Sequence, residues 1–222
     1  MKQPRVIRVY VIRCRMRGWV FYAPPEMLTA YDDEPATGFW NKLLRRAHRL
    51  HDEALTLIHE PPNRFWRGIQ RLWRWLERWT HPGEGLLRAI RHADAIELIH
   101  DGELPDDAIQ SQWITWLKTR IPIHERGLWL NIALLPVTLL LGLLPGPNIF
   151  IAWNALRLYA HWHGRQGGRR GLATVRTVVR GDARLHPPPD GSEPERQARV
   201  AQLGHTLRLP ELTTFYKRWP VR

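Results

Sequence analysis

Residues 127–156 read GLWLNIALLPVTLLLGLLPGPNIFIAWNAL, a stretch that contains no acidic, basic or histidine side chain. Arg126 and Arg157 end it, in a chain of 222 residues that carries 33 Lys+Arg and 21 Asp+Glu. A long helix in a soluble core usually keeps one polar face, and residues 128–144 show none. Because a charge at bilayer depth costs about 2.5–3.5 kcal/mol, the run predicts insertion in a membrane. A buried hairpin in a soluble helical domain is the alternative.

The middle of this stretch is broken by a turn, Leu-Pro-Gly-Pro-Asn at residues 144–148. Two prolines lack amide donors and glycine permits a positive φ, so a helix should stop there. Residues 128–144 would form only about 25 Å of helix, which barely matches a hydrocarbon core of roughly 30 Å. Two geometries remain, a re-entrant helical hairpin or one short span followed by an interfacial helix. Basic residues on both sides of the stretch favour the hairpin.

The helix expected after the turn carries a polar stripe. Asn154, Arg157, His161 and Arg165 recur at three- and four-residue steps on an otherwise apolar surface. A histidine titrates near neutrality and could relay protons, and Arg157 could pair with a lipid phosphate or an acid. The alternative is a stripe that only faces lipid headgroups. His161 and His163 are two residues apart and diverge on a helix, so they cannot share a metal.

Potassium would require oxygen ligands, and backbone carbonyls freed at the Pro-Gly-Pro break are candidates for them. No carboxylate occurs within the apolar stretch, so a homo-oligomer or a partner subunit would have to supply an acid for exchange. The candidate transport or lipid-contact residues are Pro145, Gly146, Pro147, Asn148, Asn154, Arg157, His161 and Trp162.

Residues 134–168, LLPVTLLLGLLPGPNIFIAWNALRLYAHWHGRQGG, resemble the signature of the mitochondrial potassium–proton exchange-related family. That signature comprises an apolar helix, a Leu-Pro-Gly-Pro-Asn turn, and an aromatic helix that ends near Ser/Ala-His-Trp. The segment from Leu209 to Phe215 also fits a C-terminal Leu-Pro-x-Leu pattern. The resemblance implies a membrane protein needed for potassium–proton exchange, as a component of the exchanger or an accessory to it.

The amino-acid composition indicates which chemical classes of partner and which cellular compartment to expect. The net charge of +12 predicts anionic partners, which are acidic lipid headgroups, nucleic acid or an acidic protein. One cysteine excludes an internal disulfide. No signal or transit peptide is evident, so we expect a bacterial inner membrane rather than a mitochondrial one. No catalytic motif, zinc-ligand spacing or phosphate loop occurs, so we expect no enzyme, no metal and no cofactor.

Strands are expected near the N-terminus and at two later places. The segments Arg5–Arg15 and Trp19–Tyr22 should pair as an antiparallel hairpin, which Ala95–Ile99 should join. Another strand is expected at Thr174–Val179, after a flexible basic connector at Gly164–Gly171. Helices are expected at residues 36–59, 63–79, 84–94, 104–120, 195–207 and 209–219, with Pro122 separating the fourth from the apolar stretch.

The expected fold is α+β and predominantly helical, with a small N-terminal β-hairpin, amphipathic helices, and a proline-broken apolar helical hairpin inserted in or on the membrane. Residues 1–122 would form a mixed N-terminal region, 123–168 the apolar hairpin, and 169–222 a basic linker with C-terminal helices. Two other functions stay open. One is a basic interfacial scaffold that binds anionic lipids without transport. The other is a nucleic-acid-binding protein, disfavoured because the Trp residues of 63–79 lie on or beside its apolar face.

Overall fold

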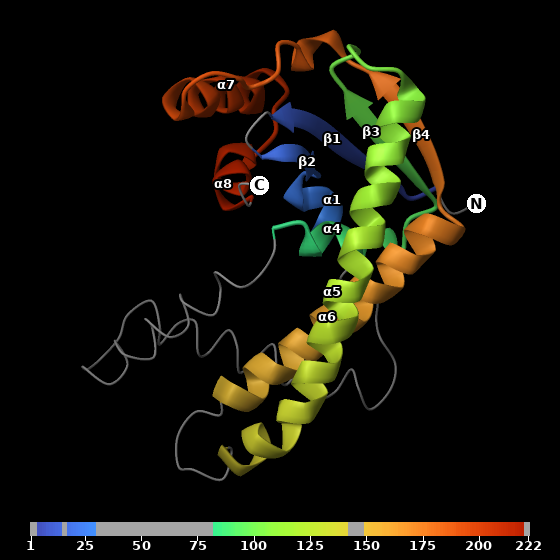
Figure 1. Cartoon of the computed structure of the whole chain (residues 1–222), viewed down its shortest axis with the longest axis vertical. Coiled ribbons are helices and arrows are strands. Elements are labelled where there is room, and N and C mark those ends of the chain that lie inside the picture. The colour runs from blue at the N-terminus through green and yellow to red at the C-terminus, as the bar shows by residue number, and fades with distance from the viewer. Residues whose placement is uncertain (1–3, 15–16, 30–81, 142–148, 220–222) are drawn as a thin grey trace. The chain divides into compact units, whose positions relative to one another are not determined.

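The structure is a computed structural model that describes residues 4–14, 17–29, 82–141 and 149–219 (Figure 1). The chain divides into two compact units. The first unit comprises Met1–Asp33, His81–Pro122 and His163–Arg222, and the second comprises Glu34–Thr80 and Ile123–Trp162. The helices expected at 36–59 and 63–79, and the turn at 145–148, lie outside the described residues.

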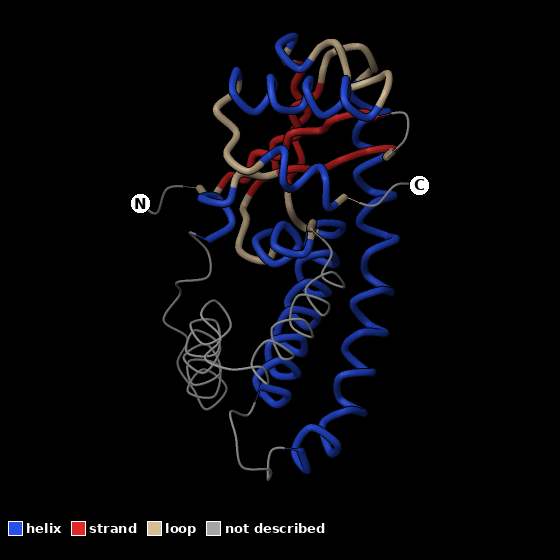
Figure 2. Tube along the Cα trace, turned by 90° about the vertical axis from the view of Figure 1, so that its left-hand side faces the viewer, coloured by secondary structure: helices blue, strands red, loops and turns tan. Residues whose placement is uncertain are grey.

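The first unit contains a four-stranded sheet in the order β2-β1-β3-β4, whose strands lie side by side (Figure 2). Its strands are β1 (Val6–Cys14), β2 (Gly18–Tyr22), β3 (Ala95–His100) and β4 (Arg176–Gly181). The predicted antiparallel hairpin of β1 and β2 is confirmed, and β3 joins it in parallel, as does β4 on β3. The strands expected at Ala95–Ile99 and Thr174–Val179 are thus confirmed as β3 and β4, and the sheet that they form with the hairpin is mixed.

The described helices are α1 (Pro25–Thr29), α4 (Glu84–Ile90), α5 (Asp106–Leu141), α6 (Ile149–Ala173), α7 (Glu193–Thr206) and α8 (Leu212–Arg218), with a 3-10 turn η1 at Ala183–Leu185. The helices expected at 84–94 and 209–219 are confirmed with shorter bounds, and the one expected at 195–207 is confirmed as α7, which begins two residues earlier. No helix in the described part of the chain is both long enough and apolar enough to cross a membrane. The predicted transmembrane helix is therefore not supported.

The prediction that Pro122 ends a helix is wrong, because α5 runs through it without interruption to Leu141. Proline removes the hydrogen bond to the carbonyl four residues earlier, which here belongs to Lys118. Both Pro122 and Lys118 are exposed, so water can replace that donor. A proline on a solvated face can therefore be accommodated within a helix.

The prediction of a flexible connector at Gly164–Gly171 is also wrong, because these residues form the last part of α6. Its glycines allow a close helix contact inside the first unit. A Cβ atom added to Gly167 would lie 1.7 Å from the carbonyl oxygen of Leu87 in α4. One added to Gly168 would lie 2.8 Å from a side-chain carbon of Ile121 in α5. The glycines therefore serve packing rather than flexibility.

The core of the first unit lies between the sheet and its helices. Alternate β-branched residues of β1, including Ile7 and Val9, are fully buried, as the period of two in a strand requires. The aromatic part of the core joins β2 to α5, where Phe21 lies 5.2 Å from the rings of both Trp113 and Trp116. These two tryptophans stack at 5.0 Å.

The substitution Gly167→Ala tests the glycine contact. The added methyl group cannot coexist with the Leu87 carbonyl at 1.7 Å, so α6 must shift and the free energy of unfolding should fall by about 1–3 kcal/mol. Urea denaturation measures the change. The control is Gly204→Ala in α7, where the added Cβ would meet only ordinary contacts at 3.5 Å or more, so stability should hold or rise. Equal stability of the Gly167→Ala variant and the native chain would refute the packing role.

Candidate functional site

The second unit contains a line of polar side chains between α5 and α6, which we call the polar seam. Its members are His124, Asn131 and Thr138 from α5, and Asn154, Arg157 and His161 from α6. The three α5 residues are spaced seven apart, which places them on one helix face. The α6 residues recur at three- and four-residue steps and so occupy one face of their own helix. The seam therefore follows from two matched helical periodicities.

Asn154 connects the two helices at one end of the polar seam. Its side chain is 2% exposed, and its Nδ2 donates to the carbonyl oxygen of Asn131 and to Oγ1 of Thr138, both at 3.1 Å. The Thr138 hydroxyl donates its own proton to the Leu135 carbonyl, so its oxygen is available as the acceptor. Within the described residues, Oδ1 of Asn154 is buried and has no hydrogen-bond partner. The Asn154 side chain therefore has one buried acceptor atom, Oδ1, that no donor among the described residues occupies.

Two histidines and an arginine form the other end of the polar seam. His124 and His161 are 4% and 7% exposed, and their Nδ1 atoms lie 3.2 Å apart. A guanidinium nitrogen of Arg157 lies 3.0 Å from Nε2 of His161. Because guanidinium only donates, Nε2 of His161 accepts, and the neutral ring carries its proton on Nδ1. That proton is donated to His124, so the contacts form a directional chain from Arg157 through His161 to His124.

Gly127 makes the room that the histidine pair needs. A Cβ atom at this position would lie 2.3 Å from Cε1 of the His161 ring. Any other residue would displace the imidazole from its position beside His124. The small residue therefore belongs to the construction of the site, although it offers no side-chain chemistry of its own.

Outside the polar seam, the α5 part of this unit is apolar and exposed. Trp129 is 69% exposed and Leu130 is 60% exposed. We call the following residues together the apolar surface of α5: Trp129, Leu130, Leu134, Val137, Leu139 and Leu140. From residue 129 to residue 140, α5 exposes large apolar side chains and keeps Asn131 and Thr138 half-buried, the reverse of a helix in a soluble domain. Exposed apolar patches commonly mark sites that contact a membrane or another protein.

The structure places the sequence-predicted site residues in different settings. Asn154, Arg157 and His161 come together against α5. The alternative in which this stripe faces lipid headgroups does not fit the burial of Asn154 and His161. Trp162 is 46% exposed. The remaining candidates, Pro145, Gly146, Pro147 and Asn148, lie outside the described residues.

His163 and Arg165 belong to the first unit. As expected from their spacing, His161 and His163 have separate partners, since Nδ1 of His163 contacts the guanidinium of Arg91. Burial, together with the charge of Arg91, lowers the pKa of His163 to about 4. His163 is therefore neutral at physiological pH and does not act as a proton carrier there.

The α5 half of the polar seam was not predicted. His124, Asn131 and Thr138 all follow Pro122 and fall in the segment 123–168, which was treated as an apolar hairpin. Their seven-residue spacing was visible in the sequence and could have identified a second polar face.

A double-mutant cycle tests the connection between α5 and α6. Asn154→Leu and Thr138→Val each remove one partner of a 3.1 Å hydrogen bond, so their destabilising effects should be non-additive by about 0.5–1.5 kcal/mol. Urea denaturation of the native chain, both single variants and the double variant gives this coupling energy. Thr115→Val, which removes an exposed hydroxyl bonded to Ser111 within its own helix, should show no coupling to Asn154→Leu. Additive effects of Asn154→Leu and Thr138→Val would rule the connection out.

Comparison with known proteins identifies the family. A family model described as mitochondrial K+-H+ exchange-related matches residues 8–172, a range that includes most of β1, all of β2 and β3, and the entire polar seam. Searches of curated proteins and of solved structures found no significant match. Because the family match covers most of the chain, this protein belongs to the mitochondrial K+-H+ exchange-related family.

Proposed function

We propose that this protein works at a membrane in potassium–proton exchange, either as a component of the exchanger or as an accessory to it. One observation carries the proposal, namely that residues 123–162 bury polar side chains between two helices and expose apolar ones. Such a surface favours an apolar solvent, because apolar side chains gain free energy on leaving water. Membership of the exchange-related family supports the same role.

Anionic lipid headgroups are the proposed partners of the basic residues that precede the apolar surface of α5. Lys118, Arg120 and Arg126 lie before it in the same helix, and each basic residue near an anionic membrane contributes about 1 kcal/mol of attraction. The described apolar part of α5, residues 128–141, is about 21 Å long, whereas a hydrocarbon core is roughly 30 Å thick. We therefore propose that it enters one leaflet. As a separate proposal, the membrane is a bacterial inner membrane.

The polar seam is the proposed place of proton and potassium chemistry. His161 and His124 can hold a proton and pass it between their rings, while the permanently charged Arg157 orients His161. Asn154 Oδ1 is an oxygen of the kind that coordinates potassium. We also propose that a second copy of the chain or a partner subunit takes part in the exchange.

Proton flux in membrane vesicles tests this function. Inside-out vesicles from cells with and without the protein receive a pulse of potassium chloride, and a pH-sensitive dye reports the proton movement. Loss of the protein should abolish the potassium-dependent part of the signal, and His161→Gln should reduce it by on the order of tenfold, because one proton carrier is removed.

The control variant is His205→Gln, which changes an exposed histidine of α7 in the first unit and should leave the flux intact. Choline chloride in place of potassium chloride measures the background. Unchanged flux after loss of the protein would eliminate the exchange proposal. Binding of the native chain to anionic lipid, together with a potassium-dependent flux that is the same with and without the protein, would instead favour the interfacial scaffold.

A further inference from the structure

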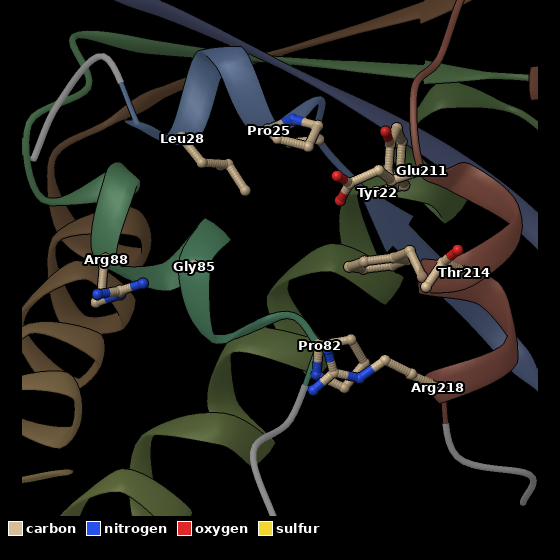
Figure 3. Close-up of a pocket in the computed structure, with 11 residues that line it drawn as sticks. Tyr22, Pro25, Leu28, Pro82, Gly85, Arg88, Glu211, Thr214 and Arg218 are labelled. Carbon is tan, nitrogen blue, oxygen red and sulfur yellow. The ribbon is translucent and has the colours of Figure 1, made fainter. Parts of the chain in front are cut away.

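A second candidate site lies entirely within the first unit. It is a cavity of about 280 Å³ bounded by the end of β2, by α1, by α4 and by α8 (Figure 3). This volume lies just below the usual range for small-molecule sites, about 300–1,000 Å³, so its ligand must be small. None of the polar seam residues lines it, and the function proposed for the seam does not use it.

Much of the cavity wall is apolar or aromatic. Leu28 from α1 and Phe215 from α8 contribute side chains to it, and the rings of Phe215 and Tyr22 meet edge to face at 5.1 Å. The Tyr22 hydroxyl donates to the Pro210 carbonyl. Burial, assisted by the charge of Glu26, raises the pKa of Tyr22, so the phenol stays neutral. Tyr22 therefore offers the ligand an aromatic surface and no charge.

Gly85 keeps this wall open on the α4 side. A Cβ atom at Gly85 would lie 3.3 Å from Cδ1 of Leu28, which is tighter than an ordinary contact. The leucine side chain can approach α4 because the glycine has no side chain. The apolar part of the cavity therefore owes its shape to this pair of residues.

The charged groups of the cavity wall are Arg88, Arg218 and Glu211, which leave one positive charge in excess. Arg88 is half-buried, and its Nε is fully buried without a hydrogen-bond partner among the described residues. A buried guanidinium N–H that lacks an acceptor is unfavourable, because it has lost water and gained nothing in return. Arg88 lines the cavity, and its positive charge attracts an anionic head there, although the buried Nε atom itself is out of a ligand's reach.

We infer that this cavity binds a small organic monoanion, whose charged head lies against Arg88 and whose short apolar body lies against Leu28 and Phe215. The single excess positive charge of the wall fits a head with one negative charge. A guanidinium pairs with both carboxylate and phosphate oxygens, so a carboxylate and a phosphodiester share the required chemistry. The first would come from a free organic acid and the second from a phospholipid headgroup.

Isothermal titration calorimetry on the intact purified chain tests the inference. The probes are hexanoate, which is a carboxylate, and dibutyl phosphate, which is a phosphodiester, with hexanol and hexylammonium as matched neutral and cationic ligands. Both anions should bind more tightly than hexanol, and hexylammonium should bind least. The anion that binds more tightly identifies the source of the natural ligand.

Variants at Arg88 separate charge recognition from general apolar binding. Arg88→Gln should weaken the binding of the preferred anion by about tenfold or more, because a charge-assisted hydrogen bond is lost, and Arg88→Lys should recover part of it. Arg176→Gln, which removes an exposed arginine of β4, should bind the anion like the native chain. Circular dichroism melting curves verify that each variant is folded.

Three results would overturn the inference. The first is that neither anion binds to the native chain. The second is that hexanol binds as tightly as hexanoate, since the cavity would then recognise only apolar bodies. The third is that Arg88→Gln and Arg176→Gln, both folded, bind the anion equally well.

Discussion

Buried polar groups need partners inside the protein, and exposed apolar groups need a medium other than water. The second unit meets the first requirement in part through Asn154, whose Nδ2 donates to the Asn131 carbonyl and the Thr138 hydroxyl, while its Oδ1 has no partner among the described residues. The second requirement applies to the apolar surface of α5, where Trp129 and its neighbours are exposed. These two facts together distinguish α5 from a helix of a soluble core, in which the polar side would face out.

Helix α6 meets two different packing requirements along its length. Its first part supplies the polar residues of the seam, and its last part supplies glycines that let it approach Leu87 in the first unit. Each requirement selects its own residue types. Polar side chains at helical spacing are needed where partner atoms are buried, and glycines are needed where a backbone carbonyl is the neighbour. A single helix can therefore belong to a packed core in one part and to a candidate functional site in another.

The strands of this fold could be predicted from sequence because their signals are local. The β-branched run of β1 and the turn before Trp19 gave the hairpin, and Ala95–Ile99 was recognised as its neighbour. The parallel addition of β4 depends on a long crossover and was not foreseen. The effects of Pro122 and of the glycines after His163 were predicted wrongly. Rules for isolated residues ignore whether water can reach the carbonyl that a proline leaves without a donor, and they ignore which neighbour a glycine packs against.

Half of the candidate site could be predicted for a similar reason. The α6 stripe of Asn154, Arg157 and His161 was visible as a helical pattern, while its partners on α5 were hidden among apolar residues. The burial of Asn154, and the tautomers of His161 and His124, depend on contacts between the two helices and cannot be read from either helix alone. The proline-rich turn between the helices lies outside the described residues, so the potassium ligands expected there stay a prediction.

The apolar surface of α5 is proposed to contact lipid, and site-specific quenching measures such contact directly. Cys14, the single cysteine, is buried, so Leu130→Cys introduces one reactive thiol at an exposed position for an environment-sensitive fluorophore. Asp107→Cys, at the exposed start of the same helix, serves as the reference. In anionic vesicles, lipid-borne spin labels should quench the probe at position 130 and aqueous iodide should not, with the opposite result at position 107. Strong iodide quenching at position 130, without quenching by the lipid-borne label, would contradict the account.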